Sequence, residues 1–247
     1  MAKIMKKTFR RAQHKAFRRA QRKVAVFDID GTIFRSSLLI ELTEALIQVR
    51  IFKPKVKDIY VRAYKKWLER RGPYEEYIGA VVKAFEKNIK GVSADNFFKI
   101  SEQVADFHKN RVYCYTRDLI KELKRKGYYI LAISNSPLST LKNFCKKLGF
   151  NKVYGRFYEI NAAGKLTGET THLDLISDKA KILLRAVEKE GLILRGSVGV
   201  GDTESDIRFL RLVEKPVCFN PNARLYQHAK KAGWKVVVER KDVIYEL

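Results

Sequence analysis

The regular pattern of the chain begins at residue 23, where an almost unbroken apolar run leads into FDIDGT. A run without polar alternation is typical of a strand buried on both faces of a parallel sheet. From residue 38 the apolar positions recur instead with the spacing of amphipathic helices. The four stripes are Leu39, Leu42, Leu46 and Val49; Ile59, Ala63 and Trp67; Ile78, Val81, Val82, Phe85 and Ile89; and Phe97, Phe98, Val104 and Phe107. Residues 36–110 are therefore predicted to form an inserted domain of four helices, with Ser93 as the N-cap of the fourth.

After residue 110, strand and helix patterns alternate. Helices are predicted at 116–126, 138–149, 178–191, 204–213 and 222–233, strands at 128–137, 197–203, 216–220 and 235–239, and a hairpin over 156–170. This alternation predicts an α/β protein with a doubly wound parallel sheet. We expect its core to consist of residues 23–35 and 111–247.

Positive charge is concentrated at the N-terminus. The 247-residue chain carries a formal net charge of +24, and residues 1–23 contain ten Lys and Arg but no Asp or Glu. We interpret residues 1–22 as a basic N-terminal extension. Such a cluster attracts polyanions, so residues 1–23 predict contact with nucleic acid or an anionic membrane surface. An organellar presequence and a solvated arm without a partner are equally consistent with this composition.

Composition argues against several other classes of protein. No window reaches 18 consecutive apolar residues, which argues against a transmembrane helix, and the N-terminus lacks the apolar segment of a secretory signal. Cys114, Cys145 and Cys218 lie far apart without a CxxC pair, which favours free thiols over disulfides or a zinc site. We therefore expect a cytoplasmic location.

The candidate chemistry lies just after the predicted strands, because doubly wound sheets bind ligands beyond the carboxyl ends of their strands. Polar residues stand there in FDIDGT, in ISNSP, at the start of the helix over 178–191 and in VGDTESD. Together these stretches supply carboxylates, a hydroxyl, a lysine and a helix N-terminus. These are the groups that can hold a phosphate beside a hard cation.

In chain order, these stretches resemble the four motifs of the haloacid dehalogenase superfamily. The matching residues are DIDGT at 28–32, Ser134, Lys179 and GDTESD at 201–206. The helical insert, GRFYEINAAGKLTGET and NPNARLYQHAKKAGW are similar to the phosphoserine-phosphatase-like branch. The resemblance covers residues 23–247 and leaves out the basic extension. It implies a Rossmann-like core, an inserted cap and the activity of a Mg²⁺-dependent phosphatase.

The resemblance also implies a role for each acidic motif residue. Asp28 is the implied nucleophile, forming an aspartyl-phosphate, and Asp30 the general acid and then the general base. The implied Mg²⁺ ligands are Asp28, the backbone carbonyl of Asp30 and Asp202, with Asp206 orienting the metal shell. Thr32 is expected to hold Asp30 by a hydrogen bond.

Phosphate binding is implied for Ser134, Asn135 and Lys179. A helix N-terminus after Ser136 and Pro137 suits the same anion. Lys181 competes with Lys179 for the cationic role. Lys179 lies twelve residues before Gly191, the spacing that the resemblance to the phosphoserine-phosphatase-like branch implies, and this favours Lys179.

The implied substrate is a small phosphorylated metabolite, with intramolecular phosphate transfer as a variant. Phosphoserine-specific members of the family carry a glutamate nine residues after the nucleophile, where this chain has Ser37. We therefore do not expect phosphoserine to be the substrate, unless Glu41, one helical turn later, takes the place of the missing glutamate. The alternative function is a polyanion-binding protein that uses its basic arm, with phosphatase activity secondary or lost. Dehalogenation is disfavoured because Asp30 is present.

Overall fold

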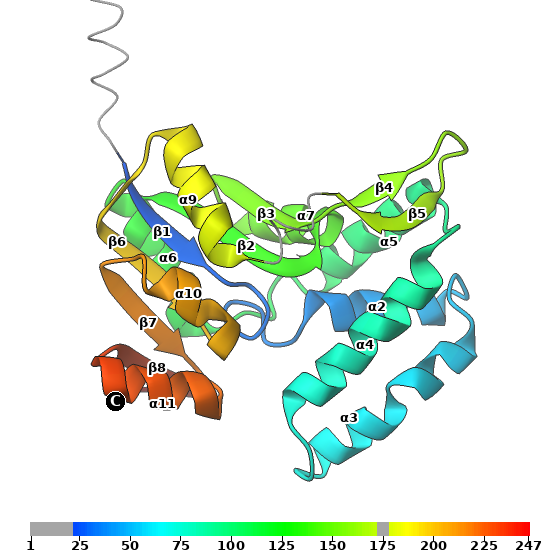
Figure 1. Ribbon diagram of the computed structural model, residues 1–247, viewed down its shortest axis with the longest axis horizontal. Helices are drawn as coiled ribbons and strands as arrows, with labels where there is room; N and C mark the ends of the chain where they lie inside the picture. Colours follow the sequence, from blue (N-terminus) through cyan, green and yellow to red (C-terminus); the bar gives the residue numbers. More distant parts are fainter. Residues whose placement is uncertain (1–21, 172–177) are drawn as a thin grey trace, which may run out of the picture.

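The computed structural model describes residues 22–171 and 178–247. Seven strands of these residues form one sheet in the order β3-β2-β1-β6-β7-β8-β9, and every neighbouring pair is parallel except β8 and β9 (Figure 1). Their bounds are β1 Lys23–Phe27, β2 Tyr129–Pro137, β3 Lys152–Arg156, β6 Ile193–Gly201, β7 Lys215–Phe219, β8 Lys235–Arg240 and β9 Val243–Glu246. The predicted doubly wound sheet is confirmed.

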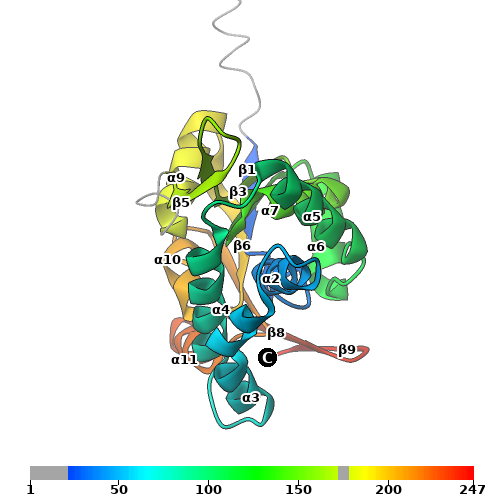
Figure 2. The ribbon, with the colours of Figure 1, turned by 90° about the vertical axis from the view of Figure 1, so that its right-hand side faces the viewer.

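Side chains of β1 alternate between two apolar layers, as the two-residue period of a strand requires. Val24 and Val26 pack on one face, and Ala25 and Phe27 on the other. Helices α9, α10 and α11 cover the first face and α6 and α7 the second (Figure 2). Their bounds are α6 Cys114–Arg125, α7 Leu138–Leu148, α9 Lys179–Glu190, α10 Ile207–Leu210 and α11 Ala223–Ala232. The run of β1 is thus apolar because both of its faces are buried.

The segment between β1 and α6 has its own apolar cluster. It contains helices α2 Leu38–Gln48, α3 Val61–Leu68, α4 Tyr74–Ile89 and α5 Ala94–Phe107, with a 3₁₀ helix, η1, at Pro54–Ile59. Phe52, Phe85 and Phe97 are buried in the cluster, and Ser93 caps α5 as predicted. Tyr158 and Leu166 of the antiparallel hairpin β4 (Tyr158–Ile160) and β5 (Leu166–Thr170) join it as well.

The predicted apolar stripes were partly wrong. Val49, Ile59, Phe98 and Phe107 are exposed, Phe107 to 85%. In α5 the buried side chains include Phe97, Ile100 and Val104, which share one helix face. Phe98 is turned about 100° away from Phe97 on a helix of 3.6 residues per turn and therefore points to solvent.

The sheet order reverses at β1, which lies between β2 and β6. Chain segments therefore leave the carboxyl ends of β1 and β6 in opposite directions, opening the crevice in which such folds bind ligands. None of the helices in residues 22–171 and 178–247 has the length and apolarity needed to span a membrane. The basic extension, 1–22, lies outside the described residues apart from Arg22.

Candidate active site

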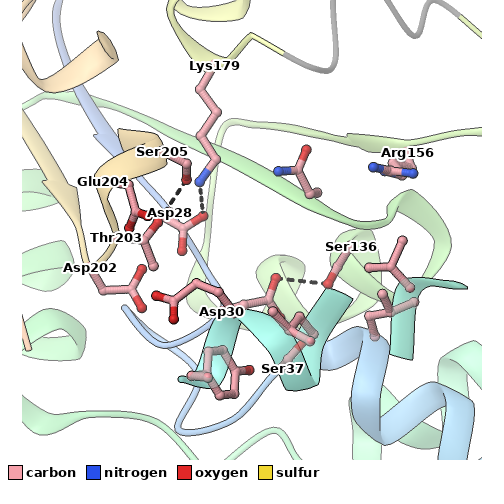
Figure 3. A pocket seen from close by; sticks show the side chains of 16 residues that line it. Asp28, Asp30, Ser37, Ser136, Arg156, Lys179, Asp202, Thr203, Glu204 and Ser205 are labelled. Atoms are coloured by element: carbon pink, nitrogen blue, oxygen red, sulfur yellow. Dashed lines mark hydrogen bonds and ion pairs between the residues drawn. The ribbon is translucent and has the colours of Figure 1, made fainter. Parts of the chain in front are cut away.

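A buried lysine joins two carboxylates at the crevice between β1 and β6. Lys179, the first residue of α9, places its Nζ 2.5 Å from Oδ1 of Asp28 (Figure 3). The same Nζ lies 2.6 Å from Oδ1 of Asp206. Asp178 caps α9 by accepting hydrogen bonds from the amides of Ala180 and Lys181. This cap turns Lys179 into the crevice, where it is only 8% exposed, whereas Lys181 is exposed. The geometry therefore favours Lys179 over Lys181.

Asp206 shapes the loop after β6. Its Oδ2 accepts hydrogen bonds from the amides of Asp202 (3.0 Å) and Thr203 (3.2 Å), while its Oδ1 meets Lys179. Both oxygens of this fully buried carboxylate are thus engaged by the protein itself. Asp206 therefore holds the loop amides of Asp202 and Thr203 and the Lys179 ammonium by direct contacts.

The crowded carboxylates have perturbed proton affinities. Burial raises the pKa of Asp28 to about 7, although Lys179 acts to lower it. Burial also raises the pKa of Asp202 well above its usual value, and the charges of Asp28 and Asp206 add to this effect. Burial alone lowers the pKa of Lys179, but the two carboxylates outweigh it and raise that pKa. The lysine is therefore charged, and the raised pKa values of Asp28 and Asp202 show that the cluster resists full ionisation when Lys179 is its balancing cation.

Asp30 is held on the opposite side, toward β2. Its Oδ1 accepts the amide hydrogen of Leu38 at 2.6 Å, and its Oδ2 accepts from the hydroxyls of Ser134 (2.6 Å) and Ser136 (2.8 Å). The prediction that Thr32 holds Asp30 was wrong. The Thr32 hydroxyl donates to Oδ1 of Asp202 at 3.2 Å, because the tight turn after β1 carries it toward β6. Ser136 was missed as a partner of Asp30.

A cavity of about 300 Å³ lies between this cluster and the helical insert. Asp28, Asp30, Lys179, Asp202 and the exposed Asn135 line it on the side of the sheet. The opposite wall comes from α2 and α4, and Arg156 at the end of β3 lies at one side (Figure 3). The insert side chains were not predicted as lining residues, since helical periodicity does not say which face meets a cavity.

The donor set suits a hard cation. Asp28, Asp202 and Asp206 each offer a carboxylate oxygen, and these oxygens lie within 4.8 Å of one another. Oxygen ligands with concentrated negative charge are what Mg²⁺ selects in proteins. Since both oxygens of Asp206 are hydrogen-bonded, Asp28 and Asp202 are the better candidates for direct contact.

Comparisons with known proteins agree with this geometry. The family model of haloacid dehalogenase-like hydrolases matches residues 25–211. The chain belongs to this family. The match begins after the basic extension and gives no support to the polyanion-binding alternative.

Similar proteins place this haloacid dehalogenase-like hydrolase in the phosphoserine-phosphatase-like branch, as predicted, and it is a phosphatase. A phosphoserine phosphatase of Mycobacterium tuberculosis is 25% identical over 219 residues, 86% of this chain and 69% of that protein. A histidinol-phosphatase of Neisseria meningitidis is 26% identical over 148 residues, 55% of this chain and 67% of that protein. A phospho-aspartyl intermediate analogue of phosphoserine phosphatase has a TM-score of 0.59 at 22% identity, covering 90% of this chain and 95% of that chain, and so shares the fold.

Glu41 of this hydrolase does not occupy the place of the missing glutamate. Its carboxylate pairs with Arg111 at 2.8 Å and with His108 at 3.2 Å. It does not line the cavity, whereas the uncharged Ser37 does. The Glu41 carboxylate, which could have met a substrate amino group, is therefore held by Arg111 and His108 and is not among the residues that line the cavity.

Gly31 makes room for Asp202. Its φ is +77°, and a Cβ built on it would overlap Oδ2 of Asp202. We expect Gly31→Ala to displace Asp202 and to weaken Mg²⁺ binding by at least about tenfold, beyond a strain cost of about 1–3 kcal/mol. Gly164→Ala is the matched control, since Gly164 has φ +68° and open space around it. Calorimetric titration with Mg²⁺ tests this, and equal affinities in the two variants would contradict it.

Proposed function

We propose that this phosphatase is a Mg²⁺-dependent phosphomonoesterase that forms an aspartyl-phosphate on Asp28 and acts on a small phosphorylated metabolite. One observation carries the proposal. Asp28 lies at the base of the cavity with one oxygen 2.5 Å from a buried lysine, and Asp30, two residues away, lines the same cavity. A nucleophile and a proton carrier thus face one substrate from a single strand end.

In the first step, a carboxylate oxygen of Asp28 attacks phosphorus and the bond between phosphorus and the ester oxygen breaks. Asp30, in its protonated form, donates its proton to the leaving oxygen, so the product alcohol departs neutral. The Ser134 and Ser136 hydroxyls and the Leu38 amide fix the Asp30 carboxyl group for this transfer.

In the second step, Asp30 takes a proton from water, and the water oxygen attacks the aspartyl-phosphate. The bond between phosphorus and Asp28 breaks, releasing inorganic phosphate and restoring both carboxyl groups. Lys179 neutralises charge on Asp28 and on the phosphoryl oxygens, and Asn135 at the end of β2 can donate to the same oxygens. The positions of Lys179 and Asn135 support their roles in phosphate binding.

Asp28 and Asp202 would hold the cation, joined by the backbone carbonyl of Asp30, while Asp206 fixes the loop of Asp202. Bound there, Mg²⁺ supplies charge that offsets the repulsion between the carboxylate and the phosphate and polarises the phosphoryl oxygens.

The substrate class is supported by two curated relatives, which are named for phosphoserine and for histidinol phosphate. Both names denote phosphate monoesters of small metabolites. Because the two relatives differ in the alcohol, membership of the branch does not specify the organic part of the substrate.

The experiment that tests the proposal is phosphate release from a panel of phosphomonoesters with Mg²⁺ and with EDTA. We expect turnover of at least one ester, a loss of at least about a hundredfold on chelation, and recovery when Mg²⁺ is restored. Turnover that persists undiminished in EDTA would contradict the metal dependence. Absence of turnover across the panel, in folded protein that binds Mg²⁺, would contradict the activity.

Asp30→Asn should separate the proton step from the attack. We expect phosphoenzyme formation to slow by about 10²–10⁴-fold for alkyl phosphates, whose leaving oxygen needs a proton. It should slow much less for 4-nitrophenyl phosphate, whose leaving group departs as a stable anion. Rapid-quench single-turnover kinetics with both esters checks this. An equal loss for both would show that Asp30 is not the general acid.

A further inference from the structure

Helix α4 carries two apolar stripes, one within the insert's own cluster and a second, partly buried one that packs against the cluster through Tyr74 and Val82. Tyr77, Val81 and Phe85 point into the insert's own cluster. Tyr74, Ile78 and Val82, each four residues apart, follow one another along an adjacent face and line the cavity. The second stripe therefore forms an apolar wall of the cavity, directly across from the catalytic carboxylates.

The side chains of this stripe carry no charge. Leu39 of α2 lines the cavity next to it. Burial, with the nearby charges of Asp30 and Asp202, raises the pKa of Tyr74, so the tyrosine stays neutral. Below, we call Leu39, Tyr74, Ile78 and Val82 the apolar wall.

The cavity's other charged side chains already have contacts within the protein, two of them ion pairs and one a hydrogen bond to an amide. Arg156 lies 2.7 Å from Glu86 of α4, and Glu204 lies 3.0 Å from Arg224. Glu75 accepts a hydrogen bond of 2.8 Å from Asn222. Among the described lining residues, every charged group outside the catalytic cluster therefore has a protein partner. A second carboxylate on the substrate would have to compete with Glu86 for Arg156, and an ammonium would meet Glu75 or Glu204 only beside their partners Asn222 and Arg224.

We propose that the substrate is the phosphate monoester of an apolar alcohol, with its hydrocarbon part against the apolar wall and its phosphate at Asp28. This rests on the proposed function and names its substrate class. A substrate with the charged head group of an amino acid would instead place part of that head group against the hydrocarbon of the wall, which costs desolvation free energy. A cavity of about 300 Å³ lies at the lower end for ligand pockets, so a short chain or a single ring fits better than a long acyl chain.

Two series of probes test this. In turnover, kcat/KM for n-alkyl phosphates from ethyl to octyl should rise by roughly three- to fourfold per methylene until the cavity is full. Phosphoserine and phosphoethanolamine should lie at least about tenfold below butyl phosphate. In binding, n-alkylphosphonates titrated by calorimetry in the presence of Mg²⁺ should tighten with length in the same way.

The two readouts separate this inference from the proposed function. Turnover with no dependence on chain length, or a preference for phosphoserine, would overturn the apolar substrate and leave the phosphatase intact. Length-dependent phosphonate binding without turnover of any ester would contradict the phosphatase and support the apolar ligand. Binding that is flat with length would overturn the inference even in an inactive protein.

Variants of the apolar wall test whether the hydrocarbon part of the ligand lies against it. Val82→Asp should weaken hexylphosphonate binding by at least about tenfold, and the isosteric Val82→Thr by roughly threefold. Val49→Asp and Val49→Thr are the matched controls, because Val49 is exposed in the same insert and does not line the cavity. If Val82→Asp does not fold, Val82→Thr is compared with Val49→Thr instead. Wild-type affinity in the folded Val82 variants would overturn the assignment of the wall.

Discussion

Asp28→Asn should abolish phosphate release, lowering kcat by about four orders of magnitude or more, as loss of a covalent nucleophile does in other enzymes. The amide keeps the shape of the carboxyl group but cannot attack phosphorus and form the acyl bond. Burial raises the pKa of Asp28 to about 7, so its ionisation without a bound cation is unfavourable. The substitution should therefore leave the fold intact while removing the reaction.

Asp58→Asn is the matched control, since Asp58 is an exposed aspartate of η1 outside the cavity. Steady-state phosphate release on the best ester of the panel is measured for both variants beside thermal unfolding. We expect wild-type turnover in Asp58→Asn. Residual turnover above about 1% of wild type in purified Asp28→Asn would contradict a role for Asp28 as nucleophile.

Lys179→Met should cost both stability and activity. It removes the cation that balances Asp28 and Asp206, leaving two buried carboxylates next to a third at Asp202. Breaking a buried ion pair from one side costs about 3–5 kcal/mol, since an uncompensated charge stays behind. We expect a loss in the free energy of unfolding of about that size at neutral pH, measured by urea denaturation without metal.

The neighbouring lysine provides the control for this measurement. Lys181→Met makes the same change two residues along α9, at an exposed position. It should alter the free energy of unfolding by less than about 0.5 kcal/mol, as surface substitutions usually do. Equal stabilities of the two variants would show that the buried lysine does not balance the acidic cluster.

Much of the site could be predicted because its residues follow apolar strands. The strand patterns before Asp28, Ser134 and Asp202 mark the carboxyl ends of β1, β2 and β6, and neighbouring parallel strands bring those ends together. Lys179 could be placed at the start of α9 from its position before an amphipathic helix. Local sequence was therefore enough to locate the site residues that lie at a strand end or at the start of a helix.

The remaining contacts depend on tertiary packing and have no local signal. Nothing in the sequence around Thr32 shows that its hydroxyl meets Asp202, which is 170 positions away. The second apolar stripe of α4 could not be told from a core-facing stripe, because both have helical spacing. Strand β9 was missed as well, since its side chains are exposed and only its pairing with β8 makes it a strand.

The most direct test of the central claim is to identify the phosphorylated residue. The enzyme is mixed with a turned-over ester and Mg²⁺, quenched in acid within one turnover, digested and mapped by mass spectrometry. We predict phosphate on Asp28 alone, as an acyl phosphate that hydroxylamine removes, and none in Asp28→Asn. Phosphate on another residue, or full turnover without any phosphoenzyme at any quench time, would contradict the account.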